Sequence, residues 1–113
     1  MRMVDCTMFV NYGLQMIEIR KTSIFTQWFD GLRDRHARAR VQVRIDRMEF
    51  GNFGDVAPVG GGVSEMRIFY GPGYRVYFIQ RGSRVIILLA GGDKSTQAAD
   101  IAHARQLASQ LGD

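Results

Sequence analysis

The side chains best suited to chemistry lie on strands predicted in the second half of the chain. Alternate residues of a strand share one face, so Glu65 and Arg67 share a face of one strand, and Arg75 and Tyr77 share a face of the next. Lys94 follows a third strand. Arginine and lysine grip phosphate, and a tyrosine ring stacks on a base. One interpretation is an open sheet face that binds a phosphate-containing ligand. The residues alone favour the other interpretation, in which Glu65 forms cross-strand salt bridges with arginine and the aromatic residues are ordinary strand residues.

The overall charge agrees with a polyanionic partner. Fifteen basic residues face eleven acidic ones among 113 residues, for a net charge of +4, and all the basic residues except Lys21 and Lys94 are arginine. Such a chain suits RNA, DNA, a ribosome or an acidic protein, although arginine is also simply the basic residue of a GC-rich genome. Further candidates for RNA contact are Arg81, at the end of the second strand, and Arg44 and Arg47, on a predicted helix.

Metal and cofactor chemistry has no support in the sequence. His36 and His103 are far apart and have no ligand partner at helical spacing, and Cys6 is the lone cysteine, which indicates a reducing compartment. No apolar run is long enough to span a membrane. We expect a cytoplasmic protein that needs no cofactor and no metal.

The first half of the chain predicts a strand and a helical hairpin. Residues 16–20 alternate like a strand, and Thr22 or Ser23 can cap a helix that carries an aromatic stripe. A second helix over 34–50 has an inner face and many arginines on its other faces. That inner face comprises Ala37, Val41, Ile45 and Met48.

The second half predicts a flexible connector, three strands and a helix. The glycine-rich residues 51–62 form the connector; strands over 63–70, 74–80 and 84–89 follow with short turns, so they pair antiparallel. The strand over 84–89 should be the most buried and central. Ser95 or Thr96 caps the last helix, whose packing stripe is Ile101, Ala104, Ala108 and Leu111, with Gly112 at its end.

These elements define an α+β fold of order β-α-α-β-β-β-α, with the helices on one face of a small antiparallel sheet. The chain is long enough for one domain. We assign that domain to residues 16–113 and interpret residues 1–15 as an N-terminal extension, with Met16 as the natural start.

Several motifs lie between residues 47 and 97 of the chain. The main motif runs from Gly62 to Phe78, GVSEMRIFYGPGYRVYF. Residues 89–97, LAGGDKSTQ, add to it, as do Arg47-Met48 and residues 51–55, GNFGD. This set resembles the RelE/ParE superfamily of bacterial toxins, in its HigB-like "addiction module killer protein" branch. The resemblance covers about residues 16–111, and the order and spacing of the motifs match the elements above.

The resemblance implies the toxin of a type II toxin–antitoxin system, and first an endoribonuclease that cuts mRNA on the ribosome. It implies an antitoxin partner, usually a helix-turn-helix protein, with operator DNA reached only through the toxin–antitoxin complex. By motif position, Arg75 matches the Arg of a Gly-Tyr-Arg element, and Arg67 and Lys94 correspond to other basic positions. Two alternatives stay open: a non-enzymatic DNA gyrase inhibitor, as in the ParE branch, and an inactive antitoxin-binding module.

The expected reaction is attack of a 2′-hydroxyl on the adjacent phosphate, which leaves a 2′,3′-cyclic phosphate. It needs alignment, charge stabilisation and two proton transfers. Arg67 and Arg75 would stabilise the phosphorane, Lys94 the leaving group, Glu65 would be the base, and Tyr77 a stacking or proton-relay group. The helix has Ala98-Ala99-Asp100 where some RelE proteins place a tyrosine.

Overall fold

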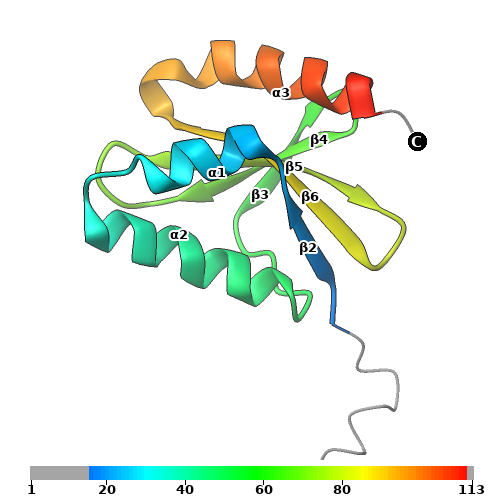
Figure 1. The fold of residues 1–113 in the computed structure, drawn as a ribbon, viewed down its shortest axis with the longest axis horizontal. Coiled ribbons are helices and arrows are strands. Elements are labelled where there is room, and N and C mark those ends of the chain that lie inside the picture. Colours follow the sequence, from blue (N-terminus) through cyan, green and yellow to red (C-terminus); the bar gives the residue numbers. More distant parts are fainter. Residues whose placement is uncertain (1–15, 112–113) are drawn as a thin grey trace, which may run out of the picture.

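The computed structural model of the chain describes residues 16–111, and the predictions for residues 1–15 and for Gly112 lie outside this range. Three helices and five strands follow one another in a mixed order (Figure 1). In chain order they are β2 (Glu18–Lys21), α1 (Ser23–Asp30), α2 (Arg35–Met48), β3 (Val56–Gly60), β4 (Val63–Ile68), β5 (Tyr74–Arg81), β6 (Val85–Asp93), a 3₁₀ turn η2 (Lys94–Thr96) and α3 (Gln97–Leu111).

The strands form one five-stranded sheet in the order β2-β6-β5-β4-β3. The predicted antiparallel meander is confirmed, because β4 pairs with β5 and β5 with β6 in antiparallel fashion. The sheet as a whole is mixed rather than antiparallel, since β2 pairs with β6 in parallel, from Glu18↔Val85 to Lys21↔Leu88. A parallel partner needs a long crossover, which the helices and the meander provide. The middle strand is β5, not the apolar β6.

The glycine-rich connector was assigned wrongly in part, because residues 56–60 form the edge strand β3. It pairs antiparallel with β4, from Val56↔Met66 to Gly60↔Val63, with a register shift between Pro58 and Gly60. Proline lacks a backbone donor and is tolerated on such an edge. Gly60 and Gly61 both have positive φ, a conformation that suits glycine and turns the chain into β4.

Helices cover both faces of the sheet, so the expectation that all helices lie on one face is wrong. Figure 1 shows α3 on the opposite side of the strands from α2. The first core lies under α1 and α2: Phe25, Val41, Ile45, Met48, Met66, Ile68, Val76, Phe78, Ile86 and Leu88. The second lies under α3: Val63, Tyr77, Ile79, Leu89, Ala90 and Ala104.

The predicted inner face of α2 is confirmed, since Ala37, Val41, Ile45 and Met48 are all buried. The stripe of α3 is confirmed in part. Ala104 is fully buried and Ile101 and Ala108 pack on the second core, but Leu111 is 45% exposed and Leu107 packs there as well.

Side-chain caps fix where the helices begin. The Thr22 hydroxyl accepts the Phe25 N–H at 3.0 Å and donates to the Leu89 carbonyl at 2.7 Å, which ties the start of α1 to β6. Asp34 accepts the N–H groups of His36 and Ala37 and caps α2. Asp93 caps the 3₁₀ turn η2 by accepting the Ser95 N–H at 2.8 Å. Ser95 and Thr96, the residues expected to cap the last helix, lie within this turn, directly before α3. Within residues 16–111 no helix has the length and apolar character needed to span a bilayer.

Replacing Gly91 by alanine should lower the free energy of unfolding by about 1–3 kcal/mol, as overpacked sites do. A Cβ at Gly91 would overlap the Trp28 indole ring, which packs directly on this stretch of β6. Urea denaturation measures the effect. Gln80→Ala, on the exposed part of neighbouring β5, is the control and should change stability by less than about 0.5 kcal/mol; equal effects would contradict the tight contact.

Candidate functional site

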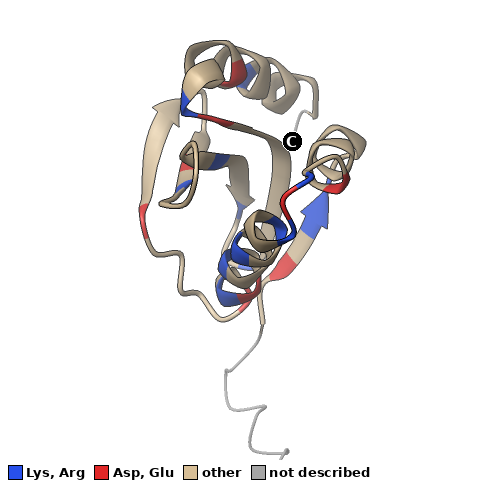
Figure 2. Cartoon of the chain, turned by 90° about the vertical axis from the view of Figure 1, so that its left-hand side faces the viewer, with Lys and Arg blue, Asp and Glu red and all other residues tan. Residues whose placement is uncertain are grey.

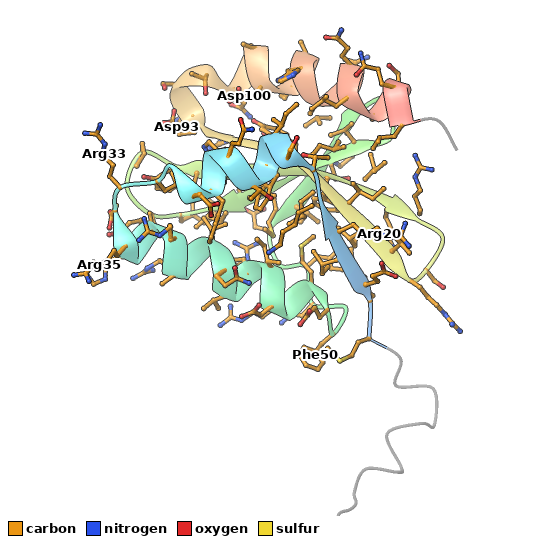
Figure 3. The ribbon with its side chains drawn as sticks, viewed as in Figure 1. Arg20, Arg33, Arg35, Phe50, Asp93 and Asp100 are labelled. Carbon is orange, nitrogen blue, oxygen red and sulfur yellow. The ribbon has the colours of Figure 1, made fainter. Side chains whose placement is uncertain are left out.

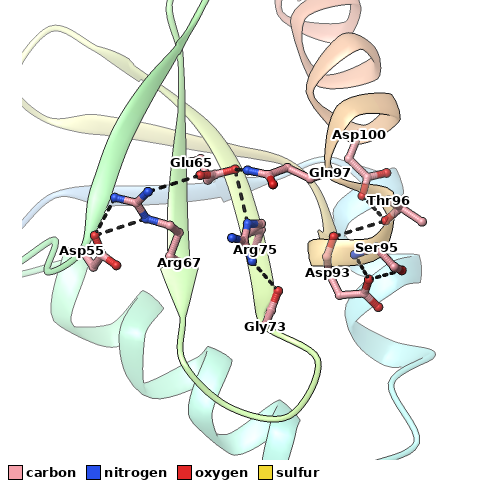
Figure 4. Close-up of polar contacts among 10 residues, drawn as sticks. All are labelled: Asp55, Glu65, Arg67, Gly73, Arg75, Asp93, Ser95, Thr96, Gln97 and Asp100. Carbon is pink, nitrogen blue, oxygen red and sulfur yellow. Dashed lines mark hydrogen bonds and ion pairs between the residues drawn. The ribbon is translucent and has the colours of Figure 1, made fainter.

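Three of the residues expected at the site, Glu65, Arg67 and Arg75, come together on β4 and β5, next to the start of α3 (Figure 4). Lys94 lies close to Gly73, in the turn between the two strands. The strand register places Arg67 opposite Arg75 and Glu65 opposite Tyr77. Lys94 begins η2, directly after β6. We call Asp55, Glu65, Arg67, Arg75, Lys94 and Gln97 the arginine–carboxylate cluster.

Glu65 is the buried centre of this cluster, with 2% of its surface exposed. Its Oε1 accepts a hydrogen bond from Gln97 Nε2 at 2.7 Å and lies 3.5 Å from Arg75 Nε. Its Oε2 lies 4.0 Å from an Arg67 Nη1. A buried carboxylate needs such compensation, so the expected cross-strand Glu–Arg pairing is present.

Arg67 is held on its other side by Asp55, in the segment before β3. Its Nη2 and Nε donate to Asp55 Oδ1 at 2.9 and 3.3 Å. The hydrogen bond with Asp55 raises the pKa of Arg67 above its usual value. About a third of the Arg67 side chain remains exposed, 35%, so the guanidinium is fixed in place and still reachable from solvent.

Arg75 and Lys94 flank Gly73. Arg75 Nη1 donates to the Gly73 carbonyl at 2.7 Å, and its side chain is only 12% exposed. A Cβ on Gly73 would lie 3.1 Å from that nitrogen and 3.6 Å from Lys94 Cβ. Lys94 itself is exposed. The exposure of the three basic side chains thus increases from the nearly buried Arg75, through Arg67, to the exposed Lys94.

The expectation of an open sheet face that displays Tyr77 is wrong. Tyr77 is completely buried, because α3 covers this face of β5. Among the described residues its hydroxyl has no hydrogen-bond partner. Burial, followed by the nearby charges of Glu65 and Asp100, raises the pKa of Tyr77. In this position Tyr77 is a core residue and cannot stack on a base.

The first turn of α3 packs against the sheet beside the cluster. Thr96 Oγ1 donates to Asp100 Oδ2 at 2.5 Å, and Asp100 lies so close to β6 that any side chain on Gly92 would overlap its carboxylate. Gly92 is the register partner of Arg75. Gly92 therefore lets α3 approach the sheet, and Gln97 at the start of this helix reaches Glu65.

The other expected RNA-contact residues lie outside the cluster. Arg81 ends β5, about 20 Å along the strand from Arg75 at 3.4 Å per residue. Arg44 supports the cluster from the opposite face of the sheet, since its guanidinium donates to the carbonyls of Arg67 at 2.6 Å and Phe53 at 3.1 Å. Arg47 is exposed on α2.

Two members of the cluster had not been assigned a role, Asp55 and Gln97. Each lies in a motif quoted above, but their partners are far away in the sequence, twelve residues for Asp55–Arg67 and thirty-two for Gln97–Glu65. His36 and His103 are both exposed. Across residues 16–111 no group of histidine, cysteine, aspartate and glutamate is arranged to hold a metal ion.

The fold and the cluster define a small α+β protein with a basic site on its sheet. No protein-family model matches the chain. A curated protein of Haemophilus influenzae (strain ATCC 51907 / DSM 11121 / KW20 / Rd), described as "Uncharacterized protein", is 47% identical over 96 residues, which are 85% of this chain and 97% of that protein. The chain belongs to the same family as this protein.

Removing the Glu65 carboxylate should destabilise the protein by about 3 kcal/mol, because the nearly buried Arg75 would lose the carboxylate with which it pairs. The variant is Glu65→Ala, measured by urea denaturation. Glu18→Ala is the matched control, since it breaks an ion pair with Arg20 in which both side chains are 58% exposed; we expect a change below about 1 kcal/mol. Equal losses of unfolding free energy in the two variants would contradict a special role for the buried Glu65 ion pair.

Tyr77→Phe should leave the protein as stable at neutral pH, or about 1 kcal/mol more stable, because it removes a buried hydroxyl without a partner. The raised pKa of Tyr77 favours the neutral phenol in the folded state. The stability of the folded state is therefore unaffected by titration of this group below the pKa of an unfolded tyrosine, about 10. As the pH rises above that value, the unfolded chain loses its phenol proton first, and the free energy of unfolding falls. Stability measured against alkaline pH should fall less steeply in Tyr77→Phe than in the unchanged protein. If the free energy of unfolding falls equally with pH in both proteins, the burial of the Tyr77 hydroxyl is contradicted.

Proposed function

We propose that this chain is the toxin of a type II toxin–antitoxin system, with the topology of the RelE/ParE superfamily, and that it cuts mRNA on the ribosome. The observation that carries the proposal is the arginine–carboxylate cluster. It contains Arg67, Arg75 and Lys94, the three basic positions that the sequence resemblance marks for phosphate contact, and they lie around one strand turn. The basic net charge of +4 agrees with an RNA substrate.

In the proposed reaction the 2′-hydroxyl attacks the adjacent phosphorus. The bond from phosphorus to the 5′-oxygen breaks, which leaves a 2′,3′-cyclic phosphate on one fragment and a 5′-hydroxyl on the other. The reactive 2′-proton leaves to a base, and the 5′-oxygen gains a proton. Negative charge builds up on the phosphorane oxygens, where preorganised cations are most effective. Arg67 and Lys94 are the cations that solvent reaches.

Burial changes the role that we propose for Glu65. With 2% exposure and contacts to Gln97, Arg67 and Arg75, Glu65 is placed to orient the two guanidinium groups rather than to take a proton from RNA. We propose that it is a positioning residue, and that solvent or the ribosome accepts the 2′-proton. Tyr77, which is fully buried, has no part in this proposal. The reaction as proposed requires no metal or cofactor.

The partners follow from the same proposal. A cognate antitoxin, of the helix-turn-helix type, would hold the toxin inactive and carry the complex to operator DNA. The ribosome and its mRNA would be the cytoplasmic target.

Induced expression in a host without the antitoxin tests this function, with RNA 5′ ends mapped over the first minutes. We expect growth arrest and new 5′-hydroxyl ends in phase with the reading frame. Lys94→Gln should reduce cleavage by about tenfold or more, as loss of one charge-stabilising group does. Arg84→Gln removes the same charge from the exposed turn at the other end of β5 and β6 and should cleave normally. Arg75→Ala is less suitable, because it also removes one of the two cations that compensate the buried Glu65 carboxylate.

Intact mRNA in arrested cells would overturn the nuclease proposal. Broken DNA in those cells would support gyrase poisoning instead, and normal growth with folded protein would support an inactive antitoxin-binding module. Equal cleavage by Lys94→Gln and the unchanged protein would remove Lys94 from the mechanism.

A further inference from the structure

A groove lies between α2 and the end of β4, on the opposite face of the sheet from Glu65. Its volume is about 360 Å³. Helix α2 supplies apolar and basic side chains to it, and the end of β4 supplies apolar ones. We call it the α2–β4 groove, and it is lined by Ala39, Arg40, Val43, Arg44, Arg47, Ile68 and Phe69.

The groove carries exposed apolar surface that the fold does not need. Phe69, directly after β4, is 80% exposed, and Val43 on α2 is 45% exposed. Ile68 is buried and belongs to the first core, so the floor of the groove is continuous with the protein interior. Aromatic and aliphatic groups that project together beside a cavity are typical of protein-binding surfaces.

All the charged side chains that line the groove are positive. Arg40, Arg44 and Arg47 line the groove from successive turns of α2, and Figure 2 shows the basic residues gathered along this helix. Within residues 16–111 no carboxylate lies within 4.0 Å of these three guanidinium groups. Arg44 is held by the Arg67 and Phe53 carbonyls, and Arg40 lies over the Tyr70 ring at 4.8 Å. Two of the three cations are thus held in place before any ligand arrives.

We propose that the α2–β4 groove binds an acidic, amphipathic segment of another protein, with an apolar side chain inserted beside Phe69 and carboxylates paired with the arginines. Charge complementarity selects an acidic partner, and the aliphatic floor of Ala39, Val43 and Ile68 selects a polypeptide over RNA. Residues 1–15 of the chain itself contain a single carboxylate, Asp5, beside Arg2, so they lack the charge of this occupant. The inference stands independently of the proposed nuclease function.

Peptide selection on the purified full chain tests the proposal. A random phage-displayed peptide library is the probe, followed by fluorescence anisotropy with one recovered peptide. We expect recovered peptides rich in aspartate and glutamate with spaced large apolar residues. Phe69→Ser, and separately Arg40→Glu with Arg47→Glu, should each weaken binding about tenfold or more. Binding should also weaken as salt rises.

Two matched controls distinguish binding in the groove from non-specific hydrophobic binding and from an effect of net charge alone. Phe50→Ser removes a phenylalanine that is 75% exposed outside the groove (Figure 3), and the pair Arg35→Glu with Arg84→Glu makes the same charge change elsewhere. Both should bind the peptide normally. Circular dichroism checks that every variant folds.

The proposal is overturned if no peptide is enriched, if the enriched peptides are basic or lack carboxylates, or if the groove variants bind them as well as the controls do. It is also overturned if the groove binds a single-stranded RNA oligonucleotide in place of peptides. Self-association that Phe69→Ser abolishes, seen by sedimentation, would show instead that a second copy occupies the groove.

Discussion

The arrangement of the site depends on one buried carboxylate. Glu65 lies on the face of the sheet that α3 covers, at 2% exposure, where an uncompensated charge would be strongly unfavourable. Its partners come from separate parts of the chain: Arg75 from the next strand and Gln97 from α3. Through Arg67 the network extends to Asp55 beside the edge strand. The need to balance Glu65 therefore links the sheet, its edge and the last helix.

This balance also limits the chemistry that the cluster can perform. Arg75 compensates Glu65 and is only 12% exposed, whereas Arg67 keeps 35% of its side chain exposed and Lys94 is free to reach solvent. A phosphate bound there would meet cations that are already oriented by carboxylates and carbonyls. Such preorganisation is what electrostatic catalysis requires, and the proposed reaction depends on it.

The two faces of the sheet divide the molecule into separate surfaces. The cluster and the start of α3 lie on one face, and the α2–β4 groove lies on the other. Arg44 connects them, because its guanidinium lines the groove and donates to the backbone of Arg67.

The sequence by itself determined the elements whose signals are local. Spacing identified the inner face of α2, from Ala37 to Met48, and short turns determined the antiparallel meander, since caps, periodicity and turns act over a few residues. Strand alternation likewise predicted that Arg67 and Arg75 share a face of the sheet, but the register that sets them opposite each other came from the structure. Only the tertiary structure decided that α3 covers the second face, which buried Tyr77 and Glu65. It also decided that residues 56–60 pair as an edge strand and that Gln97 and Asp55 complete the cluster. These outcomes depend on contacts between residues far apart in the sequence, and packing energy rather than local preference selects them.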